Sequence, residues 1–455
     1  MPDGDGLLDV RITDGQITEC ARGLRPGADE ADIDAGGSAL LPGLHDHHIH
    51  LRALAAAGAS IPAGPPQVGS AAELADALGA ADAAAPDRAW LRCVGYHESV
   101  AGQLDRWALD KLVPGRPVRV QHRTGALWML NSAATELAGL DACELPGVER
   151  DTDGKPTGRL WRMDHWLAER LPASPPDLGA VSARAAARGV TGFTDATPGA
   201  TDLDIAALAA VATAGSLVQQ VCAMAPAGTR FPDGDQAAAV IPGPVKILLD
   251  DDTLPPLDDL TAWVKQAHAA RRPVAVHCVT RVQLVLTLAA LDSAGRLRGD
   301  RIEHGAVIPP ESFRRLRGLT IVTQPQFIVE RGEQYATDVD PADQPDLWRL
   351  RSLIDAGVAV AAGSDAPFGG ADPWHVMRSA VSRPAPWTEE AVRPERALGL
   401  FLGTPAAPAV SRQVAPGRPA DLVLLRVPPA EALRSLASDL VAATFVGGHQ
   451  VYPEP

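Results

Sequence analysis

The stretch LPGLHDHHIH spans Leu41–His50 and follows the apolar pair Ala39-Leu40, which predicts the end of a buried strand. Side chains alternate between the two faces of a strand, so His48 and His50 point the same way, with Asp46 on their side. Neutral imidazole is the commonest protein ligand for transition metals. Four histidines within six residues therefore favour a metal site over a polar turn, provided that more ligands lie elsewhere in the chain.

Metal-competent side chains also end three later apolar runs. Val274–His277 ends in histidine, Arg301–Gly305 places His304 before a glycine, and Val358–Asp365 ends on aspartate. Any one of these residues alone is more often structural, because an Asp after a strand frequently caps the next helix. Together they repeat the arrangement that a parallel barrel uses, with its active site at the carboxyl ends of the strands. This repetition predicts an α/β fold with a parallel barrel.

Lys246 is one of only four lysines and lies in the apolar strand pattern Val245–Leu249. A buried ammonium without a partner is costly. A lysine of lowered pKa could react with carbon dioxide and become an anionic carbamate that bridges two metal ions. The residues alone equally allow a lysine that extends from a strand end to solvent or pairs with Asp250 or Asp251.

The order HxH, Lys, His, His, Asp along the strands resembles the amidohydrolase superfamily of metal-dependent (β/α)8 hydrolases. Longer stretches resemble its amidohydrolase family 3 branch, which includes N-substituted formamide deformylase and D-aminoacylase-like enzymes. These stretches are Pro42–His50, Gly189–Asp195, Val245–Asp250, Arg301–Gly305, Thr323–Pro325, Ala356–Pro373 and Pro416–Leu424. The resemblance thus runs nearly end to end, and its motifs are specific in combination.

The resemblance implies a metal-ligand set of His48, His50, Lys246, His277, His304 and Asp365, with Lys246 as the carboxylated bridge. One or two divalent ions, expected to be Zn²⁺, would generate hydroxide from water at neutral pH. Asp365 would be the general base and His304 a second catalytic residue, and the metal with a nearby histidine or arginine would polarise the carbonyl. The expected reaction is hydrolysis of a C–N bond in a small amide, formamide or N-acyl substrate.

Other functions of the same fold remain open. A cyclic amide hydrolase fits the same ligands, whereas a deaminase would usually carry a glutamate after the strand-five histidine, where this chain has Cys278–Arg281. A catalytically silent scaffold would have lost ligands, and a structural zinc site is usually closed and rich in cysteine. We therefore favour the hydrolase.

Both ends of the chain predict a second, smaller domain. Leu7–Cys20 alternates apolar and polar residues around an Asp14-Gly15 turn, which is a hairpin pattern. Asp421–Leu425 and Thr444–Val451 are further short strands. We expect residues 1–43 and 405–455 to form a β-sandwich and residues 44–404 to form the barrel.

An insertion at about 55–170 holds two extra strand candidates, Trp90–Tyr96 and Pro117–His122. We expect it near the active-site mouth, because binding residues often lie on such additions to a scaffold. Tyr96, His97 and His122 are therefore candidate substrate-binding residues, and Gln324 after another strand candidate is a fourth.

The composition of the chain argues against some classes of binding partner. A formal net charge of −15 with scattered acidic residues argues against nucleic acid, and no apolar stretch is long enough for a membrane span. The first residues lack the pattern of a signal peptide, and five scattered cysteines indicate a reduced compartment. We expect a cytoplasmic enzyme with a small-molecule substrate, and a homodimer as the default assembly.

Overall fold

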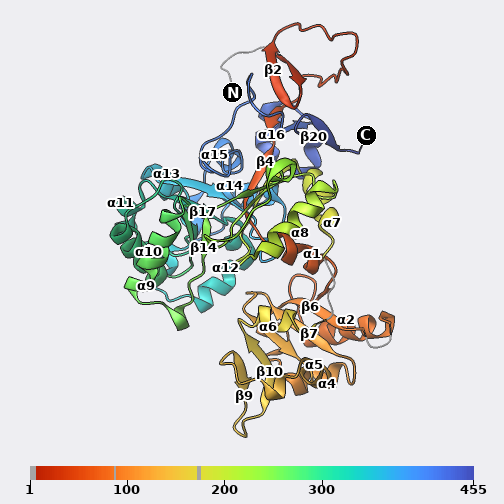
Figure 1. Cartoon of the computed structure of the whole chain (residues 1–455), viewed down its shortest axis with the longest axis vertical. Helices are drawn as coiled ribbons and strands as arrows, with labels where there is room; N and C mark the ends of the chain where they lie inside the picture. Colours follow the sequence, from red (N-terminus) through yellow and green to blue (C-terminus); the bar gives the residue numbers. More distant parts are fainter. Residues whose placement is uncertain (1–6, 87–88, 172–175, 455) are drawn as a thin grey trace. The chain divides into compact units, whose positions relative to one another are not determined.

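The computed structural model describes residues 7–86, 89–171 and 176–454, and the remaining residues are the grey trace in Figure 1. The chain divides into two units. One unit combines Met1–Leu51 with Leu178–Pro455, and the other is Arg52–Asp177. Each unit is described by itself below.

A parallel barrel forms the centre of the larger unit (Figure 1). Two parallel sheets make it, with strand orders β13-β12-β11-β4 and β14-β15-β16-β17-β18. Their bounds are β4 Leu44–Ile49, β11 Val190–Asp195, β12 Gln220–Ala223, β13 Val240–Pro242, β14 Val245–Ile247, β15 Val274–Cys278, β16 Arg301–His304, β17 Thr320–Thr323 and β18 Ala359–Ala362. Most of their residues are buried, as expected of strands covered on both faces.

Two short connections join the sheets into a barrel. On one side, the fourth strand position is split into β13 and β14 by Gly243 and Pro244, because proline has no N–H to donate to a neighbouring strand. Arg272 holds the break, since Nε and Nη2 both donate to the Gly243 carbonyl at 2.9 and 2.6 Å. On the other side, the Asp365 amide donates to the His48 carbonyl at 2.8 Å, which links β18 to β4.

Helices follow the barrel strands, as βα repetition requires. They are α1 Leu51–Gly58, which runs on into the second unit from Arg52, α7 Leu178–Ala186, α8 Asp202–Thr213, α9 Leu257–Ala269, α10 Arg281–Ala294, α11 Phe313–Leu316, α12 Gln326–Asp338, α13 Arg351–Asp355, α14 Pro373–Val381 and α15 Pro394–Gly399. Helix α10 shows why they form: the Thr280 side chain caps it by accepting from the Gln283 amide, and Leu284, Leu288 and Leu291 are buried on one face.

The expected β-sandwich is present and is built from both ends of the chain. Strands β1 Asp9–Thr13 and β2 Gln16–Ala21 form the predicted hairpin, with Asp14 and Gly15 both at positive φ, as its tight turn requires. The second sheet has the order β21-β20-β19-β3, with bounds β3 Leu40–Pro42, β19 Leu422–Leu425, β20 Val441–Val446 and β21 His449–Tyr452. Helix α16 Pro429–Ser435 connects β19 to β20. The hydrophobic core of the β-sandwich includes the buried side chains of Ile17, Leu422 and Phe445.

The unit Arg52–Asp177 has a six-stranded sheet of order β5-β6-β7-β8-β10-β9. The strands are β5 Ile61–Pro62, β6 Leu91–Tyr96, β7 Val118–His122, β8 Leu127–Leu130, β9 Val148–Arg150 and β10 Pro156–Trp161. The helices are α2 Ala71–Ala84, α3 Glu98–Ala101, α4 Arg106–Leu112, α5 Ser132–Ala138 and α6 Asp164–Ala168. Strands β6 and β7 confirm the two strand candidates of this region. A role at the active-site mouth stays a prediction.

Among the residues that the structure describes, no helix is both long and apolar enough to cross a membrane.

Candidate metal centre

Strand β4 carries the two histidines of the HxH motif to the carboxyl end of the barrel. His48 is fully buried and His50, just beyond the strand, is 12% exposed at its side chain. Their ring centroids lie 5.4 Å apart. The predicted alternation therefore does bring both rings to one place.

Asp365 follows β18, the neighbour of β4 in the barrel, and its carboxylate lies close to both histidines. Its Oδ1 atom lies 3.4 Å from Nε2 of His48 and 3.2 Å from Nε2 of His50. One ligand atom from each of the three residues lies within 4.8 Å of the others. The backbone of Asp365 is in the left-handed region, at φ 54°, a conformation that is uncommon for residues other than glycine.

His304 and His277 extend the cluster along the next strands. The His304 ring lies 4.7 Å from the ring of His48 and 4.6 Å from that of His277. Asp365 Oδ2 is 3.9 Å from Nδ1 of His304. His304 also has a left-handed backbone, at φ 68°. The strand-five and strand-six histidines are thus brought to the same site as the HxH motif.

Lys246 on β14 faces this cluster, with Nζ 3.5 Å from Nε2 of His48. Asp251, one of its two alternative partners, instead accepts hydrogen bonds from Thr280 and Gln283. Burial lowers the pKa of Lys246 below its ordinary value, although Glu303 and Asp365 act in the opposite direction. A lysine of lowered pKa beside a metal-competent histidine is the environment that carbamate formation would need.

Glu303 is a functional candidate that the sequence reasoning missed. Its Oε2 contacts Nδ1 of His48, and its Oε1 accepts from Nε of Arg301 at 2.5 Å. Glu303 and His48 are fully buried, and Arg301 is 1% exposed. Because Glu303 occupies Nδ1, Nε2 of His48 is the nitrogen that faces Asp365 and is available to a metal. The signal was the spacing of Arg301 and Glu303, two charged residues on one face of a buried strand.

Two other polar side chains support the cluster from behind. Gln324, a candidate substrate-binding residue, is fully buried, and its Oε1 lies 2.9 Å from Nδ1 of His304. This contact favours a role in orienting His304. Asp46 accepts from the backbone amides of Ser364 and His48 at 2.9 and 3.2 Å, and burial raises its pKa to about 6. The Asp46 carboxylate therefore stabilises the contact between β4 and the segment that follows β18.

The remaining candidate substrate-binding residues belong to the other unit. Tyr96 is fully buried, and its hydroxyl donates to the Gly102 carbonyl at 2.7 Å, which favours a packing role. His97 and His122 lie together with Glu98 at the ends of β6 and β7. The structure thus groups these two histidines with each other.

The electrostatics suit metal ligation. Burial lowers the pKa of both His48 and His304, and the neighbouring Lys246 acts in the same direction. Burial opposes ionisation of Asp365, but its hydrogen bond with His50 and the nearby His304 and His48 outweigh that cost and lower its pKa. Metal ligation requires neutral imidazoles and an ionised carboxylate, and these shifts supply both at neutral pH.

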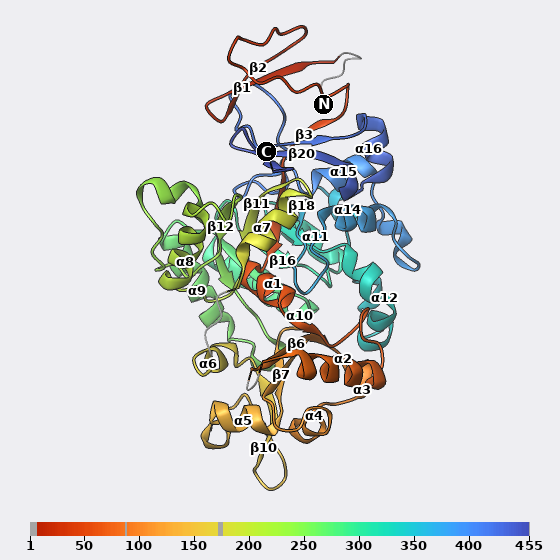
Figure 2. The same ribbon diagram turned by 90° about the vertical axis from the view of Figure 1, so that its right-hand side faces the viewer.

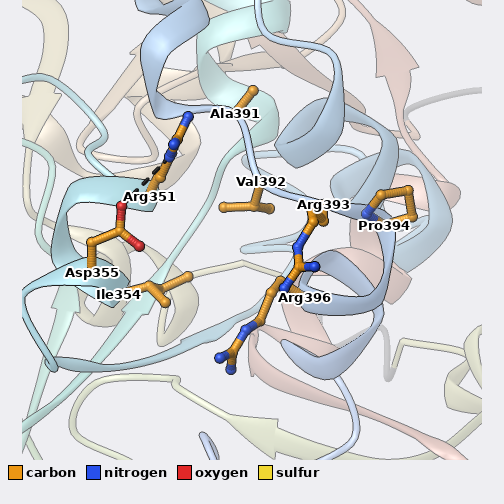
Figure 3. A pocket seen from close by; sticks show the side chains of 8 residues that line it. All are labelled: Arg351, Ile354, Asp355, Ala391, Val392, Arg393, Pro394 and Arg396. Carbon is orange, nitrogen blue, oxygen red and sulfur yellow. Dashed lines mark ion pairs between the residues drawn. The ribbon is translucent and has the colours of Figure 1, made fainter.

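A separate surface cavity of about 550 Å³ has different chemistry (Figure 3). Arg351, Arg393 and Arg396 line it, and Arg351 pairs with Asp355 at 3.5 Å. None of its lining residues is a candidate metal ligand, so this cavity is not the metal centre.

Histidine nitrogens and carboxylate oxygens in a buried site are the donor set that Zn²⁺ and similar ions take in catalytic centres. The fit extends to the outer contacts, because Glu303 and Gln324 contact the Nδ1 atoms of His48 and His304. The residues present therefore fit a resident divalent metal.

Known proteins resemble the chain over nearly its whole length. A family model described as "Amidohydrolase family" matches residues 32–452. Protein LONG AFTER FAR-RED 3 of Arabidopsis thaliana is 25% identical, over 93% of this chain and 84% of that protein. N-substituted formamide deformylase of Arthrobacter pascens is also 25% identical, over 95% and 92%. An uncharacterized metal-dependent hydrolase from Pyrococcus horikoshii OT3 superposes with a TM-score of 0.72 at 16% identity, covering 96% and 95% of the two chains.

Proposed function

The chain belongs to the amidohydrolase family, and we propose that it hydrolyses a C–N bond of a small amide-type substrate with the help of one or two divalent metal ions, Zn²⁺ by preference. The observation that carries this proposal is the position of Asp365, whose Oδ1 lies within 3.4 Å of Nε2 of both His48 and His50. A carboxylate held against two histidines can serve both as a ligand and as a base.

A bound metal would lower the pKa of a water molecule toward neutrality and polarise the substrate carbonyl. His48, His50, His277 and His304 would hold it together with Asp365. Lys246, if carboxylated, would bridge to a second ion, and its lowered pKa supports that reaction with carbon dioxide.

Asp365 is the residue that would move the proton. Its lowered pKa keeps the carboxylate ionised before the reaction. As water attacks the carbonyl carbon, Asp365 would accept the proton of that water and return it to the leaving nitrogen. The C–N bond breaks, and the products are a carboxylic acid and an amine. His304, held through Nδ1 by Gln324, would stand beside the carbonyl oxygen.

Similarity to the deformylase supports a formamide or N-acyl substrate over a cyclic amide. The test combines metal analysis of protein never exposed to chelator with a panel of N-formyl amines, N-acyl amino acids, cyclic amides and aminopyrimidines. We expect bound zinc-class metal and amine release from the first two groups. Protein without metal would refute the proposal, and ammonia release from aminopyrimidines alone would replace it with a deaminase.

Two histidine variants distinguish the loss of a metal ligand from the general effect of replacing a histidine. His48→Ala should abolish hydrolysis and remove much of the metal. His449→Ala provides the matched control, because His449 is exposed on β21 of the sandwich, and it should keep both. Equal metal content in the two variants would contradict the proposed ligand set.

A further inference from the structure

A second group of metal-competent side chains lies outside the barrel, where β6 and β7 end in the Arg52–Asp177 unit. These strands are parallel neighbours (Figure 2), and Tyr96 pairs with His122 in their register. His97 follows the last residue of β6, so parallel pairing places it beside His122. The two imidazole centroids lie 5.8 Å apart.

Glu98 lies within reach of both rings. Its Oε2 is 3.0 Å from Nε2 of His122 and 4.0 Å from Nε2 of His97. One ligand atom from each of the three residues lies within 4.8 Å of the others. We propose that His97, Glu98 and His122 bind one divalent transition-metal ion of the zinc class.

Each ring is anchored through its other nitrogen by the residue two positions later. Ser99 N and Oγ lie 3.2 and 2.9 Å from Nδ1 of His97. Thr124 N and Oγ1 lie 3.3 and 2.8 Å from Nδ1 of His122. The two HxS/T segments thus fix both rings in the same way. A ligand ring that is already held loses less conformational entropy when an ion binds.

The hydroxyls of Ser99 and Thr124 also bear on the imidazole proton that a metal ion would displace from Nε2. Where the backbone amide donates to Nδ1, the neutral ring carries its proton on Nε2, and His122 donates that proton to Glu98. An ion bound at Nε2 requires the proton to move to Nδ1. The backbone amides of Ser99 and Thr124 would then lose Nδ1 as their acceptor, and the hydroxyl oxygens of the same residues, at 2.9 and 2.8 Å, would accept the proton instead. A hydrogen-bond acceptor behind each metal-bound histidine is the usual arrangement at such sites.

The exposure of the three side chains also suits an ion. The three side chains are between 12 and 38% exposed, so an ion has access from solvent and can keep a water ligand. Two imidazoles, one carboxylate and a water complete the four ligands that Zn²⁺ prefers.

The number of zinc ions bound per full-length chain tests the proposal. Equilibrium dialysis against Zn²⁺ would compare the wild type with His97→Ala and His122→Ala. His165→Ala is the matched control, because His165 pairs with Glu169 at 3.2 Å in an exposed i,i+4 arrangement on α6 of the same unit. The barrel ligands are intact in every variant, so ions bound there cancel from the difference.

We expect His97→Ala and His122→Ala each to bind one ion fewer than the wild type, and His165→Ala to bind the same number. Equal binding by all four folded proteins, checked by circular dichroism, would overturn the proposal. If the variants do not fold, wild-type crystals soaked in Zn²⁺ decide the question. An anomalous peak at about 2.0–2.1 Å from both Nε2 atoms supports the site, and its absence overturns it.

Discussion

Replacing Glu303 by glutamine should weaken the barrel centre in two separable ways. The first is structural, because Arg301 would keep its charge at 1% exposure after losing the carboxylate that accepts from its Nε at 2.5 Å. Breaking a buried ion pair by removing one partner costs ~3–5 kcal/mol of stability. We expect a loss of that size in the free energy of unfolding of the metal-free protein.

The second effect is on metal binding. Glu303 holds Nδ1 of His48, so Nε2 is the nitrogen offered to a metal. An amide at position 303 can donate to Nδ1, which would place the ring proton on Nε2 and block it. Loss of such an outer contact usually weakens metal affinity by ~10–100-fold. That range corresponds to ~1.4–2.7 kcal/mol of binding free energy.

Two matched variants separate these effects. Glu390 is also largely buried and pairs with Arg349 at 3.1 Å, so Glu390→Gln should lose stability and keep its metal affinity. The double variant Arg301→Met/Glu303→Leu removes the whole pair, which should restore stability and leave metal binding weak. Zinc affinity would be measured by competition with a chelator, and stability by denaturant unfolding of the metal-free forms. A folded Glu303→Gln protein with wild-type zinc affinity would refute the reasoning.

Three further outcomes are expected. Asp365→Asn should retain metal while turnover falls by ~10²-fold or more, the scale for a lost acid–base group; a fully active variant would place the base elsewhere. Lys246→Ala should lose the second ion and most activity, with partial rescue by short carboxylates, whereas an unmodified ammonium at full metal occupancy would exclude the bridge. The metal-free protein should lose stability as pH falls below about 6.5, because unfolded histidines take up protons there while His48 and His304, of lowered pKa, do not. Each such histidine lowers the free energy of unfolding by up to ~1.4 kcal/mol per pH unit. A free energy of unfolding that is the same at pH 7 and pH 6 would contradict this assignment.

Local patterns predicted the parts of the site that depend on strand alternation and strand ends. The HxH spacing placed His48 and His50 together, and the apolar runs before His304 and Asp365 placed those residues at the same end of the barrel. The role of Glu303 was not predicted because His48 becomes its partner only after β16 and β4 fold together. The contact of Arg272 with the break between β13 and β14 was likewise not predicted, since the two segments lie 29 residues apart in the sequence.

The two left-handed residues of the metal centre, His304 and Asp365, set a limit on engineering this protein for heat resistance. Each pays for its position with unfavourable backbone torsion, of order 1–3 kcal/mol for such a conformation. A design procedure that rewards only a low energy of the folded chain would therefore replace both with glycine or asparagine. The resulting protein would melt later and have lost two of the proposed metal ligands. A stabilised variant of this chain must accept those two conformations and gain its resistance elsewhere.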